Sequence, residues 1–214
     1  MKDVRICFIG ESFINGTGDS THLGWTGRLC VALSRAGYWV TYYNLGIRRE
    51  TSTELANRWQ AEAERRLPAD CDNYIVFSFG TNDTTIENGK LRVELIDSLE
   101  NARQILATAK QNHRVLMISP PPTADEERHT RVKVLSEHFC TLCQELTISY
   151  LDVFTPLLNS PVWMAEVEAG DGSHPDAAGY EELAQLVQSW SAWYNWFKPS
   201  MSNHTLPTGS KIHG

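Results

Sequence analysis

The chain has 214 residues, of which 42% are hydrophobic, and this length suits a single domain with a substantial core. Its formal net charge is -7 and its pI is about 5.5, and its lysines and arginines form no cluster dense enough for a nucleic-acid or anionic-membrane surface. Every apolar run is also too short to span a bilayer. The charge distribution therefore excludes nucleic acid as an expected partner, and the short apolar runs exclude integral membrane contact.

Cysteine usage and the N-terminus predict a compartment. The N-terminal Met1-Lys2-Asp3 leads directly into a strand-length apolar run, without the apolar core and cleavage site of a signal peptide. The five cysteines are an odd number without framework spacing, which favours a reducing environment. Cys140 and Cys143 lie within a helical apolar repeat and are interpreted as packing residues, not as a redox or metal pair. We therefore expect a cytoplasmic protein, unless a leader has been removed.

Strand-like and helix-like segments alternate along the chain. Continuous apolar runs predict five buried strands, and 3-4 spacing of apolar residues predicts five helices between and after them. The strands are expected at 4–9, 39–43, 74–79, 115–118 and 148–153, and the helices around 25–36, 55–63, 91–106, 132–146 and 180–197. This alternation predicts an α/β fold with a doubly wound, mainly parallel five-stranded sheet. The domain is expected over residues 1–198, followed by a flexible polar tail over 199–214.

The last predicted helix has a broad apolar and aromatic stripe. It runs from Tyr180 to Phe197 at 3-4-3-4-3 spacing. A stripe of this kind is typical of core packing, and any exposed part of it would serve as the face of a homodimer. We assign it no catalytic meaning.

Polar residues with catalytic capacity follow four of the predicted strand segments. Ser12 comes after the first strand, Gly46 after the second and Asn82 after the third, while Asp171 and His174 follow the fifth. Because the carboxyl ends of parallel strands meet at one edge of a sheet, the topology would bring these residues together. The sequence therefore predicts a composite site at that edge.

These residue types suit acyl transfer by a serine. The hydroxyl of Ser12 needs a base to take its proton during attack, and the imidazole of His174 is such a base near neutral pH. Asp171, three residues earlier, would fix the tautomer and orientation of the imidazole. The oxyanion needs preorganised donors, for which the backbone N–H groups of Ser12 and Gly46 and the side-chain amide of Asn82 are candidates.

The four blocks resemble those of the SGNH hydrolases, the GDSL-like lipase/acylhydrolase family. They are Gly10-Glu11-Ser12-Phe13, Asn44-Leu45-Gly46, Gly80-Thr81-Asn82-Asp83 and Asp171-Gly172-Ser173-His174-Pro175, in the family's chain order. The likeness extends over about residues 4–195 and implies a flavodoxin-like three-layer α/β/α sandwich with an SGNH hydrolase-like domain over residues 1–198.

The resemblance also implies roles and partners. Ser12 would be the nucleophile, His174 the general base and Asp171 its orienting acid, with Ser12, Gly46 and Asn82 as the oxyanion hole and no metal or other cofactor. The substrate would be a small-molecule ester such as an acyl ester, an acetylated sugar or a lysolipid, and thioesters also fall within the family. Glu11 is a departure, because the family's name motif has aspartate there, but this position holds none of the four chemical roles.

Some further residues compete for a role or leave one open. The Asp19–His22 pair has the same spacing as Asp171–His174, but we interpret it as a capping and solvated segment at the rim. Asp152, at the end of the fifth strand, is interpreted as structural, and residues 126–129 as a solvated helix start. Trp163 and Met164 would line an acyl pocket or only cover the core.

Two functions without turnover are the alternative to an esterase. In a flavodoxin-like binding module, the loop over residues 12–20 would hold a phosphate or FMN through hydroxyl and backbone N–H groups. This function leaves the Asp171–His174 pair unexplained, so we rank it below the esterase. A domain of the same fold could also bind an acylated ligand without hydrolysing it.

Overall fold

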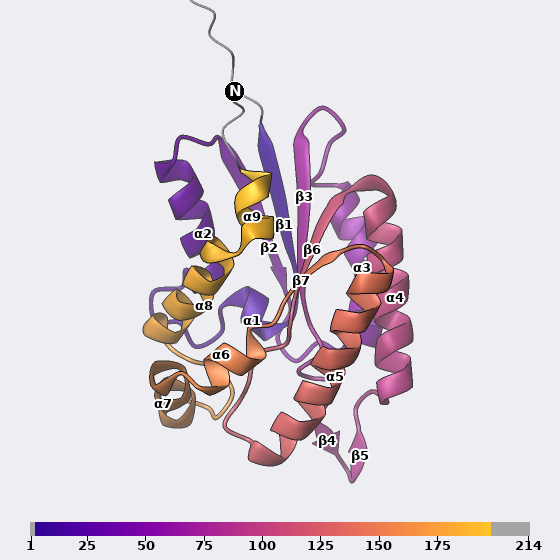
Figure 1. Ribbon diagram of the computed structural model, residues 1–214, viewed down its shortest axis with the longest axis vertical. Coiled ribbons are helices and arrows are strands. Elements are labelled where there is room, and N and C mark those ends of the chain that lie inside the picture. Colours follow the sequence, from indigo (N-terminus) through magenta and orange to yellow (C-terminus); the bar gives the residue numbers. More distant parts are fainter. Residues whose placement is uncertain (1–2, 198–214) are drawn as a thin grey trace, which may run out of the picture.

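The computed structural model describes residues 3–197, and its centre is one parallel sheet of five strands in the order β2-β1-β3-β6-β7 (Figure 1). The strands are β1 (Val4–Gly10), β2 (Val40–Gly46), β3 (Asp72–Ser78), β6 (Arg114–Ile118) and β7 (Ser149–Leu151). The predicted α/β fold and its five strands are confirmed, although β7 is shorter than expected.

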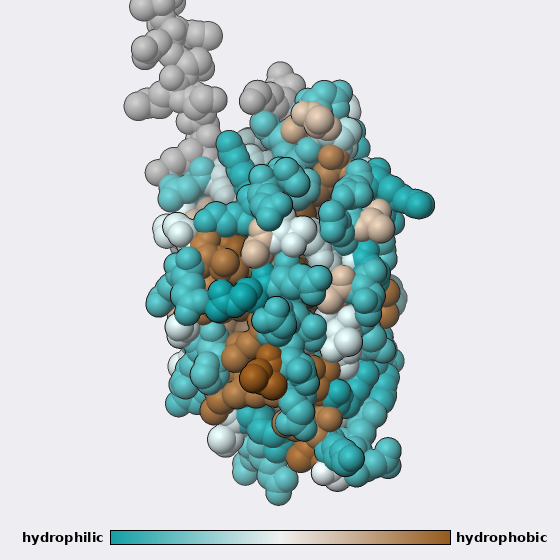
Figure 2. Space-filling view, turned by 90° about the vertical axis from the view of Figure 1, so that its right-hand side faces the viewer, coloured by the Kyte–Doolittle hydropathy of each residue, from teal (hydrophilic) through white to brown (hydrophobic). Residues whose placement is uncertain are grey.

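Helices cover both faces of the sheet. One layer, on the left in Figure 1, contains α1 (Ser12–Asn15), α2 (Gly24–Arg35), α6 (Phe154–Leu158), α7 (Pro161–Ala169), α8 (Ala177–Ser189) and α9 (Ser191–Trp196). The other layer contains α3 (Ser52–Glu64), α4 (Leu95–Asn112) and α5 (Glu126–Glu145). Figure 2 shows the side that carries α4, where hydrophilic side chains cover most of the surface and apolar patches lie between them.

The residues of β1 show why its apolar run is continuous. Ile6 and Phe8 pack with the helices of one layer, whereas Cys7 and Ile9 pack with those of the other. All four side chains are fully buried. A strand that is covered on both faces needs apolar residues at every position, not at alternate ones.

The register of the sheet brings its loops to one edge. Gly10, the last residue of β1, pairs with Gly46 of β2 on one side and with Ser78 of β3 on the other. The three strands therefore end level with one another. Their following loops meet at the lower edge of the sheet in Figure 1, beside α1.

Side-chain caps begin several helices where the sequence signals them. Thr51 and Glu54 form a reciprocal capping box at the start of α3. Asp125 accepts a hydrogen bond from the backbone N–H of Arg128 at the start of α5, and Ser160 caps α7.

Two predicted helices differ from the structure. The helix expected from residue 91 begins at Leu95, because Asn88 and Gly89 form a tight turn with positive φ between two short antiparallel strands. These strands are β4 (Ile86–Glu87) and β5 (Lys90–Leu91). The helix expected over 180–197 breaks at Trp190, whose backbone is extended, and α9 follows as a separate short helix that packs on β1 through Trp193.

The aromatic stripe of the last helices is mostly core. Tyr180 and Phe197 are buried, and Trp193 packs 6.3 Å from Phe8 of β1 between ring centroids. Tyr194 is the exception, with 56% of its surface exposed. Core packing therefore accounts for most of the stripe, and a homodimer stays a prediction.

The predicted tail over residues 199–214 lies outside the described residues. Within residues 3–197, every helix is too short or too polar to cross a membrane.

Candidate active site

The end of β1 places Ser12 at the edge of the sheet. Gly10 lies so close to β3 that a Cβ there would be 1.8 Å from the carbonyl oxygen of Ser78, so only glycine fits. The chain then turns at Glu11, and Ser12 is the first residue of the short helix α1. Ser12 is 4% exposed and lies at the C-terminal edge of the sheet.

Ser12, His174 and Asp171 form a continuous chain of contacts. Nε2 of His174 lies 2.8 Å from Oγ of Ser12, and Nδ1 of His174 lies 2.8 Å from Oδ2 of Asp171. The other carboxylate oxygen of Asp171 accepts hydrogen bonds from the backbone N–H groups of Ser173 and His174, at 3.0 and 2.9 Å. A carboxylate can only accept, so it favours the tautomer with the proton on Nδ1 and leaves Nε2 free to take a proton from Ser12.

The surroundings of His174 keep it neutral near pH 7. Burial lowers its pKa, and Asp171 opposes this effect while the charges of Arg48 and Arg128 add to it. The ring also packs against Phe13, 5.1 Å away between centroids. Burial raises the pKa of Asp171, but its hydrogen bonds from His174 outweigh this effect and lower the pKa to about 2. A neutral imidazole beside an ionised carboxylate is the arrangement that a general base needs.

Asn82 lies at the same site, but its side-chain amide is already engaged. Nδ2 donates to Oε2 of Glu11 at 2.6 Å and to the backbone carbonyl of Glu50 at 3.0 Å. Glu11 also accepts from the backbone N–H groups of Thr81 and Asn82, at 3.1 and 3.2 Å. Glu11 was assigned no chemical role from its place in the motif, whereas in the structure this buried side chain ties the turn before Ser12 to the loop after β3.

Gly46 lies beside the turn that carries Ser12. A Cβ at Gly46 would be 2.3 Å from the backbone nitrogen of Asn15, so the glycine allows β2 to approach α1 closely. Its own N–H donates to Oδ1 of Asn44 at 3.1 Å. A part for Gly46 in an oxyanion hole therefore stays a prediction, and in this structure its N–H has another acceptor.

A pocket of about 330 Å³ opens over these residues. Ser12, Asn82, Asp171 and His174 all line it. Four arginines also line it, at positions 48, 49, 92 and 128, and the sequence analysis assigned none of them to the site. Arg48 and Arg49 could have been found, because they follow the Asn44-Leu45-Gly46 block directly.

The expectation of a solvated helix start at residues 126–129 is wrong for Arg128. This side chain is 8% exposed and reaches the loop after β3, where Nε donates to the hydroxyl of Thr84 at 3.1 Å. The first turn of α5 packs against that loop, and no local pattern in the sequence reports such a contact between distant segments.

The competing Asp19–His22 pair does not form a second site. Asp19 is buried and not solvated as expected, and it accepts hydrogen bonds from the backbone N–H groups of Thr21 and Gly24 at 2.8 and 2.7 Å. It also pairs with Arg28. Asp19 therefore caps the start of α2, which agrees with its predicted capping role.

The remaining candidates are structural. Asp152 caps α6 by accepting from the backbone N–H of Phe154 at 2.9 Å, as expected for a structural carboxylate. Trp163 is fully buried, donates to the carbonyl of Pro122 at 3.1 Å and stacks on Phe13. Met164 is partly buried against the same core cluster. The open alternative for Trp163 is thus decided in favour of core packing.

The loop over residues 12–20 offers little to a phosphate. The backbone N–H groups of Gly16 and Thr17 donate to the carbonyl of Ser12, and that of Asp19 donates to Gly16. The N–H of Ser20 donates to Asp176. Because these donors are used within the protein, the geometry disfavours the predicted phosphate or FMN cradle. Within residues 3–197, His, Cys, Asp and Glu form no group of three that could hold a metal ion.

The sheet order and the two helical layers define an SGNH hydrolase-like α/β fold. Residues 8–182 match the GDSL-like Lipase/Acylhydrolase family, and the chain belongs to this family.

Solved structures share the fold at low sequence identity. A lipase/acylhydrolase from Enterococcus faecalis has a TM-score of 0.72 and 21% identity, over 87% of this chain and 93% of that one. LAE5, an alpha/beta hydrolase enzyme from the metagenome of Lake Arreo, has a TM-score of 0.70 and 18% identity, over 85% and 92%. Axe2, an acetylxylan esterase from Geobacillus stearothermophilus, has a TM-score of 0.70 and 17% identity, over 85% and 91%. No curated protein sequence matches the chain significantly.

Proposed function

We propose that this protein is a serine esterase that forms an acyl-enzyme on Ser12. The observation that carries the proposal is the chain of two 2.8 Å contacts from Ser12 through His174 to Asp171. As Oγ of Ser12 attacks the ester carbonyl carbon, Nε2 of His174 takes the hydroxyl proton, and it then gives this proton to the leaving alcohol. His174 next takes a proton from water, whose attack on the acyl-enzyme releases the acid and restores Ser12.

The oxyanion would be held by donors near Ser12. As the first residue of α1, Ser12 has a backbone N–H without an acceptor inside the helix. The amide of Asn82 would supply a second donor by giving up its bond to the carbonyl of Glu50, because the shorter bond to the carboxylate of Glu11 is the stronger one. Glu11 would thus hold Asn82 in place during the exchange.

The pocket favours a small, polar ester over a long acyl chain. Among the described residues that line it, Phe13 is the single apolar side chain. A lysolipid or long-chain ester would need an apolar surface to replace water around its chain. We therefore expect short acyl groups, including acetyl esters of polar alcohols, as substrates. The family and the acetylxylan esterase with the same fold support an ester substrate of this kind.

Labelling with a fluorophosphonate probe tests the nucleophile directly. Intact and peptide mass spectra should show one adduct on the peptide that contains Ser12, and the Ser12→Ala variant should remain unlabelled. Ser34→Ala is a matched control, because Ser34 is an exposed serine on α2. An unlabelled wild-type protein between neutral and mildly alkaline pH, or labelling of Ser12→Ala at the wild-type rate, would refute the proposal.

A further inference from the structure

The catalytic pocket is rich in arginine although the chain as a whole is acidic. Three of the four arginines in it have carboxylate partners. Nη2 of Arg49 lies 2.7 Å from Glu87, and Nη2 of Arg48 lies 3.4 Å from Asp171. Arg92 lies 3.7 Å from Glu54 and from Glu87. These three cations therefore carry their own counter-charges.

Arg128 differs from the other three. Its Nη2 donates to the hydroxyl of Thr85 at 2.6 Å and to the carbonyl of Thr81, and its Nε donates to Thr84, so all its acceptors are neutral. Within residues 3–197, no carboxylate oxygen lies within 4.0 Å of its guanidinium group, and Nη1 donates to no protein group. Arg128 is nevertheless buried, with only 8% of its surface exposed.

A buried cation without a direct partner is costly. Guanidinium stays protonated in proteins, so Arg128 cannot avoid the cost by losing its charge. Glu11 and Asp125 are the carboxylates that act on Arg128 from a distance. Burial raises the pKa of Glu11 to about 7, and its carboxylate is already held by the loop after β3 and does not contact Arg128. The charge of Arg128 is therefore poorly compensated inside the protein.

Thr81 lies at the same pocket and does not supply the missing charge. Its hydroxyl oxygen is buried without a partner at hydrogen-bond distance, and its interaction with Glu11 partly opposes the rise in pKa that burial causes in that carboxyl. Thr81, Arg128 and Ser12 all line the pocket. A guanidinium group without a direct counter-charge in this polar pocket is complementary to an anion.

We propose that Arg128 binds a carboxylate-like anionic group of the substrate, so that the enzyme prefers esters with a negative charge close to the ester bond. This inference rests on the proposed esterase function and names its substrate class. The free Nη1 of Arg128 can donate charge-assisted hydrogen bonds to a carboxylate, because Nε and Nη2 are already held by threonines of the loop after β3. The anion would supply the missing counter-charge, and it would lie near the reacting bond because Arg128 lines the same pocket as Ser12 and His174.

Two matched pairs of esters test this preference and show on which side the charge lies. Mono-4-nitrophenyl succinate and its neutral methyl ester carry the carboxylate or its uncharged counterpart on the acyl side. 3-Acetoxybenzoate and its methyl ester do so on the alcohol side. In low salt, kcat/KM should be about 10- to 100-fold higher for the charged member of one pair, as expected for hydrogen bonds to a charged group.

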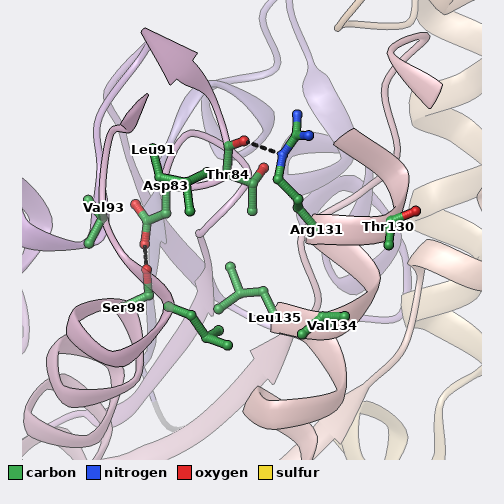
Figure 3. Close-up of a pocket in the computed structure, with 10 residues that line it drawn as sticks. Asp83, Thr84, Leu91, Val93, Ser98, Thr130, Arg131, Val134 and Leu135 are labelled. Atoms are coloured by element: carbon green, nitrogen blue, oxygen red, sulfur yellow. Dashed lines mark hydrogen bonds between the residues drawn. The ribbon is translucent and has the colours of Figure 1, made fainter. Parts of the chain in front are cut away.

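Variants assign the preference to Arg128. Arg128→Met should remove it mainly by raising KM for the charged ester. Arg128→Lys should keep only part of it, because an ammonium group has three hydrogens and cannot both replace the threonine contacts and bind the anion. Arg131→Met is the matched control. Arg131 also lies in the first turns of α5 but donates to the carbonyl of Thr84 beside a separate apolar pocket (Figure 3), so its loss should leave the preference intact.

Several outcomes would overturn the inference. Wild-type protein that hydrolyses both members of each pair equally well has no anion site. An equal loss on charged and neutral esters in Arg128→Met, with an unchanged thermal unfolding midpoint, would mean that Arg128 stabilises the oxyanion or the loop instead. If Arg128→Met does not fold, Arg128→Lys decides, since an undiminished preference there would show that the free Nη1 of Arg128 does not bind the anion.

A binding measurement separates this inference from the esterase proposal. Calorimetric titration with succinamate, the amide counterpart that an esterase does not hydrolyse, and with 3-hydroxybenzoate should show binding of at least one anion to wild type and Arg131→Met, and much weaker binding to Arg128→Met. Such binding by a protein that neither reacts with the phosphonate probe nor hydrolyses any ester would refute the esterase and keep the anion site. Hydrolysis without anion binding or charge preference would refute the anion site and keep the esterase.

Discussion

Two segments of this chain have an aspartate three residues before a histidine, and their structures are very different. In Asp171-Gly172-Ser173-His174-Pro175 the imidazole folds back onto its own aspartate and reaches Ser12. In Asp19-Ser20-Thr21-His22 the histidine is exposed, and its ring makes no hydrogen bond to Asp19. The same spacing therefore gives a Ser–His–Asp chain of contacts in one place and a helix cap in the other.

The partners of each carboxylate explain the difference. Asp19 pairs with Arg28 and accepts two backbone N–H groups at the start of α2, which leaves it no free oxygen directed at His22. The cation near Asp171 is Arg48, which is 61% exposed and 3.4 Å away, so it competes weakly for Oδ2. The spacing is the same in both segments. The cation beside each aspartate determines whether a carboxylate oxygen remains free to bind the imidazole.

Removing each histidine should separate the two segments most clearly. His174→Ala is expected to lower kcat on a short-chain ester by about 10⁴-fold or more, because Ser12 then has no base. His22→Ala should change kcat less than about twofold, since the exposed ring contacts neither Ser12 nor Asp19. Steady-state kinetics with 4-nitrophenyl acetate measure both, and comparable losses in the two variants would contradict the assignment.

Asp171→Asn tests the orienting carboxylate without changing its size. The amide can present its N–H₂ group to Nδ1 and favour the wrong tautomer, so kcat should fall by about 10²- to 10⁴-fold. KM should change little, because the interaction matters in the transition state. The matched variant Asp19→Asn should keep kcat near the wild-type value. A large loss of kcat in folded Asp19→Asn would show that the cap region also takes part in catalysis.

Asn82→Ala should give the next largest effect on activity. Loss of one oxyanion donor is expected to lower kcat by about 10²- to 10³-fold. The variant also removes the contacts to Glu11 and Glu50, so its thermal unfolding must be measured beside its kinetics. An undiminished kcat would indicate that Asn82 only ties the loop after β3 to the turn before Ser12.

The sequence predicted most of the fold and the ends of the strands, but not the walls of the pocket. Continuous apolar runs are a local signal of buried parallel strands, and the topology then places Ser12 and His174 at one edge. The burial of Arg128 has no such signal, because it depends on the packing of α5 against a loop more than 40 residues earlier. The break at Trp190 was missed for a similar reason. The 3-4 spacing of apolar residues continues through it, whereas the position of α9 depends on packing against distant β1.

Asp19→Asn should lower stability instead of activity. A buried acceptor that loses its charge leaves Arg28 and the start of α2 less well satisfied, and about 1–3 kcal/mol of unfolding free energy should be lost at pH 7. Burial raises the pKa of Asp19, but its hydrogen bond from Arg28 and its further bonds outweigh this effect and lower the pKa to about 2. The stabilisation is thus present above the unfolded pKa near 4 and is lost as the pH falls toward 2. Denaturant unfolding of both proteins should show their difference shrinking over this range, and a constant difference would contradict the ionic role of Asp19.

The smallest expected effect is a shift of the acid limb of the pH profile. Activity should fall as the pH drops through the pKa of His174, because the imidazolium cannot accept the proton of Ser12. Since burial lowers this pKa, the limb should lie below the ordinary histidine value of about 6.5. Asp171 raises the pKa and Arg48 lowers it. In kcat/KM profiles, Asp171→Asn should therefore move the limb to lower pH and Arg48→Gln to higher pH. Shifts in the same direction would mean that the charges around His174 do not set its protonation, and the contrast with the Asp19–His22 segment would then rest on geometry alone.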